Sequence, residues 1–405
     1  MDFRNLETLK TVVIHQVDEQ LYTATYEGRM FSIGVLLFQS LQMLEQNIHL
    51  DQIATRISAQ HEIQLSGEQL MVYLNQFVDI IEVDEKQDST LTSYVYWKVK
   101  MMGERPIQLI ANTMAPLFHK YVLALLLPLS TYITVWFMGQ LYYSGQLLQD
   151  RSIGDSVLAI LLTYAGLIGL AFFHEFGHAS AAAYYKKPSD SIGFGFYLVF
   201  PVFFTDVTSI WNLNRWKRIV VNIGGIYFQL LSNMLLAGAF LLTANQEVQI
   251  IFKYFFIANL VYIFYSLNPF LRNDGYWVYS DLFRLPNLTQ RARRYPLQLL
   301  QRIFDQKAYT LKGTYLRFIK EFPLLIYSFG YVLVMGLIVL ALAWLTIKNV
   351  GELSAIGSKI SAFGWGYISE DWARIGKLCF GLFINIFFLS RMIKHFIIRP
   401  YLQRR

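Results

Sequence analysis

The pattern of apolar and polar positions divides the chain into two parts. Residues 1–100 mix apolar and polar side chains as a soluble domain does, and long apolar runs begin only near Phe118. A helix needs about 20 residues to cross the roughly 30 Å hydrocarbon layer of a bilayer. The pattern therefore predicts a mainly α polytopic membrane protein with about six transmembrane helices, near 118–143, 157–185, 219–243, 250–267, 323–346 and 375–397.

The first hundred residues predict an α+β fold. Residues 11–17 and 21–26 alternate as a strand pair, and three helix-forming segments follow. A second alternating pair is expected near 80–100, where it would form a wing. This β-β-α-α-α order predicts a winged-helix-like domain over residues 1–100, followed by a membrane domain over residues 101–405.

Capping residues predict where the three N-terminal helices begin. Ser32 is expected to cap the first helix, and Asp51 or Leu50 is expected to open the second. Ser66 and Gln69 have the spacing of a capping box, in which each side chain bonds the backbone N–H of the other residue.

A short segment inside the membrane part has the pattern of strands. Residues 193–204, GFGFYLVFPVFF, are rich in aromatic and β-branched residues and lie between two apolar helices. We expect a membrane-embedded β-hairpin, whose free edge could hold a substrate peptide in extended form. The alternative is an aromatic amphipathic connector without strands.

Composition supports the membrane assignment and excludes some chemistry. Hydrophobic residues make up 55% of the chain and charged residues 16%. The single cysteine, Cys379, excludes an intramolecular disulfide and a cysteine-rich metal site. The first 20 residues lack a cationic segment followed by an apolar one, so no cleaved signal peptide is expected.

The distribution of positive charge predicts the topology. Segment 268–322 holds ten Lys and Arg residues, whereas the loops 144–156, 245–249 and 347–372 together hold three. Cytoplasmic loops carry the excess of Lys and Arg, so both termini are expected in the cytoplasm of a bacterial-type inner membrane. The net charge of +7 is mostly this bias, and no nucleic-acid partner is needed to explain it.

The second apolar stretch contains the motif HEFGH, which carries the candidate chemistry. Positions four apart on a helix are offset by about 40° and rise by about 6 Å, so His174 and His178 share one face. Two such imidazoles can bind one Zn2+, with Glu175 as general base. The alternative is a polar pair hydrogen-bonded inside a helix bundle. Ionisable groups in hydrocarbon are costly and usually mark function, which favours the zinc site.

A catalytic zinc ion with two imidazole ligands needs another protein ligand from elsewhere in the chain. The best candidate is Asp274, which follows a helix-ending proline, Pro269, in the segment SLNPFLRNDG. Taken alone, this segment would be more typical of a surface turn. Asp206 is a rival carboxylate, although the residues after it are more typical of a cap at the cytoplasmic edge.

These motifs together resemble the site-2 protease family of intramembrane zinc metalloproteases. HEFGHASAAAYY looks like that family's zinc helix, SIGFG resembles its Gly-x-Gly hairpin element, and NPFLRNDG stands at its Asn-Pro…Asp-Gly motif. The resemblance covers most of residues 118–290 and is closest to the peptide zinc metalloprotease branch. In two departures, the common Asn-x-x-Pro-x-Pro-x-Leu-Asp spacing is shortened, and Gly224-Gly225-Ile226 replaces a frequent Ala-Gly-Pro.

The resemblance implies a role for each candidate residue. His174, His178 and Asp274 would hold the zinc ion. Glu175 would deprotonate the attacking water and then protonate the leaving amine. Asn268 would donate a hydrogen bond to the substrate backbone or to the oxyanion.

The N-terminal pattern resembles the PqqD-like peptide-recognition domain, which binds precursor peptides of ribosomally made modified natural products. The resemblance rests on the order of elements and implies a leader peptide bound by strand addition at a sheet edge. A DNA-binding winged helix is the alternative, but residues 60–76 carry too little positive charge for a recognition helix.

Three functions follow from these observations. The first is a membrane-embedded zinc endopeptidase that matures a ribosomally synthesised peptide presented by the N-terminal domain. The second is a site-2 protease that releases a membrane-bound regulator, although no PDZ-like insertion is present to favour it. The third is a non-proteolytic partner of a peptide exporter, against which an intact Glu175 argues.

Overall fold

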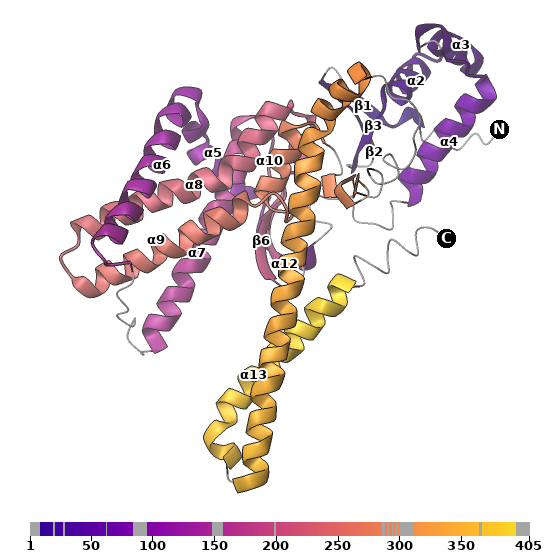
Figure 1. Ribbon diagram of the computed structural model, residues 1–405. Helices are drawn as coiled ribbons and strands as arrows, with labels where there is room; N and C mark the ends of the chain where they lie inside the picture. The colour runs from indigo at the N-terminus through magenta and orange to yellow at the C-terminus, as the bar shows by residue number, and fades with distance from the viewer. Residues whose placement is uncertain are drawn as a thin grey trace. The chain divides into compact units, whose positions relative to one another are not determined.

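The computed structural model describes most of the chain, which forms two compact units (Figure 1). One unit consists of residues 1–197 and 201–284, and the other consists of residues 198–200 and 285–405. The described residues are 9–18, 21–26, 29–61, 63–83, 95–147, 157–197, 200–285, 288–289, 291–293, 295–296, 299, 311–363 and 367–393.

The N-terminal strands form an antiparallel sheet in the order β1-β2-β3. The predicted strand pair is confirmed as β1 (Val13–Asp18) and β2 (Leu21–Tyr26), and β3 (Arg29–Ile33) adds a strand that was not predicted. The cap predicted at Ser32 is wrong, because Ser32 lies within β3 and pairs with Thr23 of β2.

Three helices follow the sheet, as predicted. α2 (Val35–Glu45) begins after Gly34, which makes no side-chain capping bond, and α3 (Leu50–His61) begins at Leu50. The capping box of α4 (Gly67–Val83) is confirmed. The backbone nitrogen of Ser66 lies 3.1 Å from Oε1 of Gln69, and the backbone nitrogen of Gln69 lies 3.2 Å from Oγ of Ser66.

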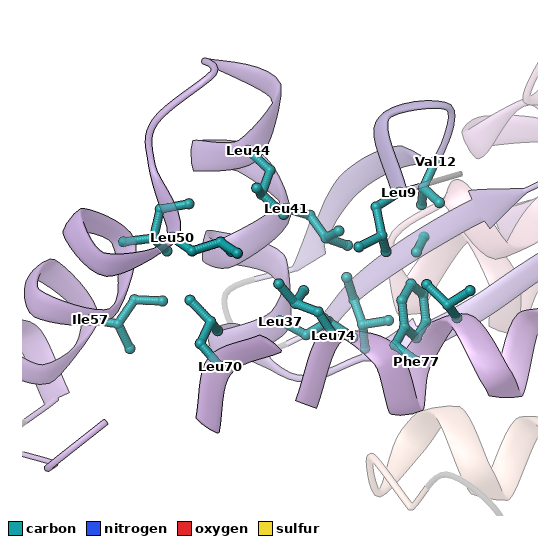
Figure 2. Packing of buried hydrophobic residues seen from close by; sticks show 14 of the residues in the cluster. Leu9, Val12, Leu37, Leu41, Leu44, Leu50, Ile57, Leu70, Leu74 and Phe77 are labelled. Carbon is teal, nitrogen blue, oxygen red and sulfur yellow. The ribbon is translucent and has the colours of Figure 1, made fainter. Parts of the chain in front are cut away.

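The apolar faces of these helices and the sheet close one hydrophobic core (Figure 2). The apolar positions of α2 and α4 recur three or four residues apart, so each helix presents one continuous stripe to the core. Burying one such side chain stabilises the fold by roughly 1.5–3 kcal/mol. The core includes Leu37, Leu41 and Leu44 of α2, Ile53 and Ile57 of α3, and Leu70, Leu74 and Phe77 of α4.

The predicted second strand pair near 80–100 lies partly outside the described residues, which omit 84–94. The segment forms the strand β4 (Val95–Gly103), but β4 pairs antiparallel with β5 (Ser191–Tyr197), far along the chain. With β6 (Phe200–Thr205) these strands make a sheet in the order β4-β5-β6. The two strands of the hairpin predicted at 193–204 are therefore present as β5 and β6, and their embedding in a membrane stays a prediction. The domain boundary predicted after residue 100 falls within β4.

Long helices make up most of the remaining chain. Among the residues whose side chains are described, four segments are long and apolar enough to cross a membrane: Lys120–Tyr143, Arg215–Leu242, Gln246–Leu267 and Glu321–Ser361. They belong to α6 (Lys120–Tyr143), α8 (Arg215–Leu242), α9 (Gln246–Leu267) and α12 (Leu311–Phe363). The other elements are α5 (Glu104–Met114), η2 (Ala115–Phe118), α7 (Val157–Tyr184), η3 (Thr208–Asn212), α10 (Asp274–Leu282) and α13 (Tyr367–Ile393).

The loop predicted at 347–372 is mostly helical. α12 continues through it to Phe363, and α13 already begins at Tyr367. The 53 residues of α12 span about 80 Å at 1.5 Å per residue, which exceeds the hydrocarbon thickness of a bilayer. No proline interrupts residues 347–363, so the helix can extend beyond its apolar part. The six-span topology stays a prediction.

Candidate metal centre

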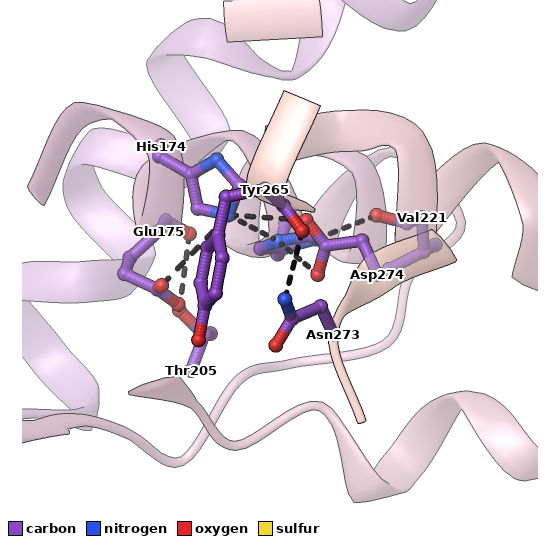
Figure 3. Close-up of polar contacts among 8 residues, drawn as sticks. His174, Glu175, Thr205, Val221, Tyr265, Asn273 and Asp274 are labelled. Carbon is purple, nitrogen blue, oxygen red and sulfur yellow. Dashed lines mark hydrogen bonds and ion pairs between the residues drawn. The ribbon is translucent and has the colours of Figure 1, made fainter. Parts of the chain in front are cut away.

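The HEFGH motif lies on α7, where the predicted i, i+4 geometry is present. His174 and His178 are buried, and their Nε2 atoms lie 3.2 Å apart (Figure 3). α8 can approach them closely because Gly177 faces Gly224. A Cβ at Gly177 would lie 2.3 Å from the carbonyl oxygen of Gly224. The small residues of α7 therefore bring a second helix against the histidines, as expected for a buried site.

Both histidines are held against neighbouring helices. Nδ1 of His178 lies 2.8 Å from the carbonyl oxygen of Val221 on α8, to which it can donate, leaving Nε2 free to bind a metal. The ring of His174 lies 5.2 Å from the ring of Tyr262 on α9. Gly225 is necessary on α8, because a Cβ there would lie 2.5 Å from both imidazole rings.

The structure brings the predicted third ligand to the histidines. Oδ2 of Asp274 lies 3.2 Å from Nε2 of His174, and Oδ1 lies 3.4 Å from Nε2 of His178. Asp274 is the first residue of α10, after α9 has ended at Leu267. The chain must fold back tightly between these helices. A Cβ at Gly275 would lie 2.1 Å from the carbonyl oxygen of Leu267.

The spacing of these three side chains fits a zinc ion. Ligand atoms about 2.0–2.1 Å from a tetrahedral zinc ion lie about 3.3–3.4 Å from one another. The two Nε2 atoms lie 3.2 Å apart, close to that distance, and one ligand atom from each of His174, His178 and Asp274 lies within 4.8 Å of the other two. Two neutral imidazoles and a carboxylate are also a donor set that zinc prefers. Among the described residues, this is the one group of three or more such side chains close enough to hold a metal ion.

Glu175 lies beside the three candidate ligands and is not part of that group. Its Oε1 lies 4.0 Å from Nε2 of His174. Its Oε2 accepts a hydrogen bond from Oγ1 of Thr205, 2.7 Å away at the end of β6 (Figure 3). The hairpin therefore orients this carboxylate, a contact that the sequence analysis did not predict.

Asn268 and Asp206 make other contacts. Oδ1 of Asn268 accepts a hydrogen bond from the backbone nitrogen of Phe270 at 2.9 Å, and Asn268 is not among the residues that line the cavity at the histidines. Its role as a hydrogen-bond donor stays a prediction. Oδ1 of Asp206 accepts from the backbone nitrogen and the hydroxyl of Thr208, as expected for a cap.

A cavity of about 130 Å³ lies beside His174, His178 and Asp274. Most of the residues that line it were not predicted from the sequence. Its wall combines aromatic and polar side chains. No local motif marks these residues, because they come from separate elements. They include Phe203, Phe204, Trp211, Tyr262, Tyr265 and Trp277, with Thr205, Arg218, Asn222, Asn273 and Asp281.

A buried ion pair between Arg218 and Asp281 forms part of the cavity lining. Nε of Arg218, on α8, donates to Oδ1 of Asp281 on α10 at 2.9 Å. Burial raises the pKa of Asp281 above its ordinary value, while the hydrogen bonds and the positive charge of Arg218 act in the opposite direction. Removing either partner would leave a charge buried without compensation.

Comparison with known proteins gives one partial match. Over 107 residues the chain is 30% identical to "Putative peptide zinc metalloprotease protein YydH" of Bacillus subtilis (strain 168). The match covers 25% of this chain and 40% of that relative's length. No family model and no solved structure matches the chain. The similarity to this relative therefore extends over less than half of the relative's length.

Proposed function

We propose that the chain is a site-2-protease-like zinc endopeptidase of the bacterial inner membrane that matures a ribosomally synthesised peptide. The observation that carries this proposal is the convergence of His174, His178 and Asp274 beside Glu175. A bound zinc ion would supply a Lewis acid that polarises the scissile carbonyl.

Glu175 would transfer the protons, and Thr205 would hold Glu175 in position. Glu175 would accept a proton from the attacking water through Oε1 and pass it to the leaving amine. Thr205 would hold Oε2, so that the carboxylate keeps one orientation through both transfers. The buried surroundings of Glu175 would exclude bulk water and strengthen these interactions.

β6 is the candidate surface for the substrate. It is an edge strand of its sheet, and Val202, Phe203 and Phe204 from this strand line the cavity beside the metal ligands. An extended peptide added at this edge would receive main-chain hydrogen bonds and would run past Glu175. The N-terminal domain would hold the leader of the same peptide. A leader domain favours peptide maturation over release of a membrane-bound regulator.

The test is Glu175→Gln, which preserves size but cannot act as a base. The purified full-length protein is compared with wild type for zinc content and for cleavage of internally quenched peptides in detergent. Activity should fall by about 10²–10⁴-fold with one zinc ion still bound. His174→Ala serves as a control that should lose the metal as well. Unchanged cleavage by Glu175→Gln would refute the protease proposal.

A further inference from the structure

The third metal ligand lies on a short helix that is anchored at both ends. α10 has nine residues, with Asp274 at its first position and Asp281 next to its last. Asp281 lies seven positions after Asp274, which is a rise of about 10 Å along the helix axis. A small tilt of this helix about one end would therefore move the other end, and with it any ligand there.

The anchor at the first end comes from the end of α9. Nδ2 of Asn273 donates to the carbonyl oxygen of Tyr265 at 2.8 Å. Gly275 lies directly against the carbonyl of Leu267. These contacts fix the position of the chain next to Asp274. Further along the helix, the ring of Trp277 lies 5.9 Å from the ring of Trp211.

The anchor at the second end comes from α8. Arg218 donates to Oδ1 of Asp281 through Nε at 2.9 Å and through Nη2, and its Nη1 donates to the carbonyl oxygen of Leu213 at 2.9 Å. Nδ2 of Asn222 lies 3.4 Å from Oδ2 of Asp281. The exposed fraction is 6% for the Arg218 side chain and 11% for Asp281, so the pair is shielded from solvent.

The same face of α8 also holds the histidines. Arg218, Val221 and Gly225 are spaced three and four residues apart, so they share one side of the helix. Val221 contacts His178, and Gly225 lies against both imidazoles. One rigid helix thus contacts the two imidazole ligands and, through Arg218, the helix of the third. A buried ion pair is rarely the most stabilising choice for packing alone, which favours a role in defining geometry.

We infer that Arg218 and Asp281 are positioning residues that set the pose of Asp274 and thereby the affinity of the metal centre. The pair fixes the direction of α10, so that both carboxylate oxygens of Asp274 face the imidazoles. This inference rests on the proposed zinc site but adds residues that neither bind the metal nor react.

The experiment measures metal binding directly in the metal-free full-length protein in detergent. Zinc affinity is determined by competition with a chromophoric chelator, and Co2+ is added separately because its visible spectrum reports coordination geometry. The variants are Asp281→Asn, which keeps shape and removes charge, and Arg218→Lys, which keeps charge and removes the fork of donors. Arg374→Gln is the matched control, since Arg374 forms an exposed ion pair with Glu352 at 3.2 Å.

Asp281→Asn should weaken zinc binding by about 10–100-fold, the range seen when groups behind metal ligands are removed. Arg218→Lys should have a smaller effect in the same direction, and both should alter the Co2+ spectrum. Excess zinc should restore cleavage by these variants but not by Glu175→Gln. Arg374→Gln should match wild type.

The outcomes separate this inference from the proposed function. Wild-type zinc affinity and an unchanged Co2+ spectrum in folded Asp281→Asn and Arg218→Lys would overturn the positioning role alone. A wild-type protein that binds no zinc would overturn the zinc site and this inference with it. Should Asp281→Asn fail to fold, Arg218→Lys decides, because it keeps a charge opposite Asp281.

Discussion

The N-terminal hydrophobic core and the helices around the candidate metal centre bury different kinds of side chain. The N-terminal core is built almost entirely from leucine, isoleucine, alanine, valine and phenylalanine. The helices α7 to α10 instead bury His174, Glu175, His178 and Arg218 among apolar residues. Apolar burial explains how the first region folds, whereas buried ionisable groups oppose folding unless they are paired. The helices α7 to α10 therefore bury groups that lower the stability of the fold but that the proposed chemistry requires.

Gly225→Ala should have the largest effect in this comparison. The added methyl carbon would lie 2.5 Å from the imidazoles of His174 and His178, so one ring must move. We expect zinc affinity to fall ten-fold or more, measured by chelator competition. Gly139→Ala on α6 is the matched control, because a Cβ there meets nothing within 4 Å. Equal zinc affinity in both variants would contradict the close packing of α8 on the histidines.

Ile53→Ala tests the apolar N-terminal core. Ile53 is fully buried in the N-terminal core, and removing its side chain should destabilise that domain by about 2–5 kcal/mol. Hydrogen exchange of the α3 amides in the full-length protein measures the loss, with exposed Val72→Ala as control. Zinc affinity should stay at the wild-type value. A parallel loss of zinc would mean that the two regions fold as one cooperative unit.

Ser66→Ala should have the smallest effect. It removes one half of the capping box at the start of α4, which is worth about 1 kcal/mol. Exchange of the first amides of α4 should quicken, while exchange in α2 and zinc binding should not change. Gln52→Ala on the exposed surface of α3 is the control. Unchanged exchange in α4 would show that the cap contributes nothing measurable.

Local sequence patterns predicted the contacts between residues that are close together in the sequence. The shared face of His174 and His178 follows from helix periodicity, and the bonds between Ser66 and Gln69 follow from a spacing of three residues. The placement of Asp274 beside the histidines came from a motif resemblance, since no helical or strand period joins positions 178 and 274.

The sequence patterns did not predict the contacts between segments that are far apart in the chain. Alternation predicts strands near 80–100, but it carries no information about which distant strand will pair with β4. Likewise, Arg218 and Asp281 each read as ordinary charged residues near a helix end, and their contact depends on how α8 and α10 pack. The continuation of α12 to Phe363 was missed because hydropathy marks where a helix can meet lipid and does not mark where the helix ends.

The approach of α7 and α8 at two glycines limits how this sequence can change over time. A Cβ at Gly177 would meet the carbonyl of Gly224, and a Cβ at Gly224 would meet the carbonyl of Gly177. Neither position can therefore enlarge while the other stays as it is, and enlarging both would add to the overlap. Descendants of this chain that still use the two imidazoles can diverge at the exposed positions of both helices, but they would have to keep Gly177 and Gly224 together.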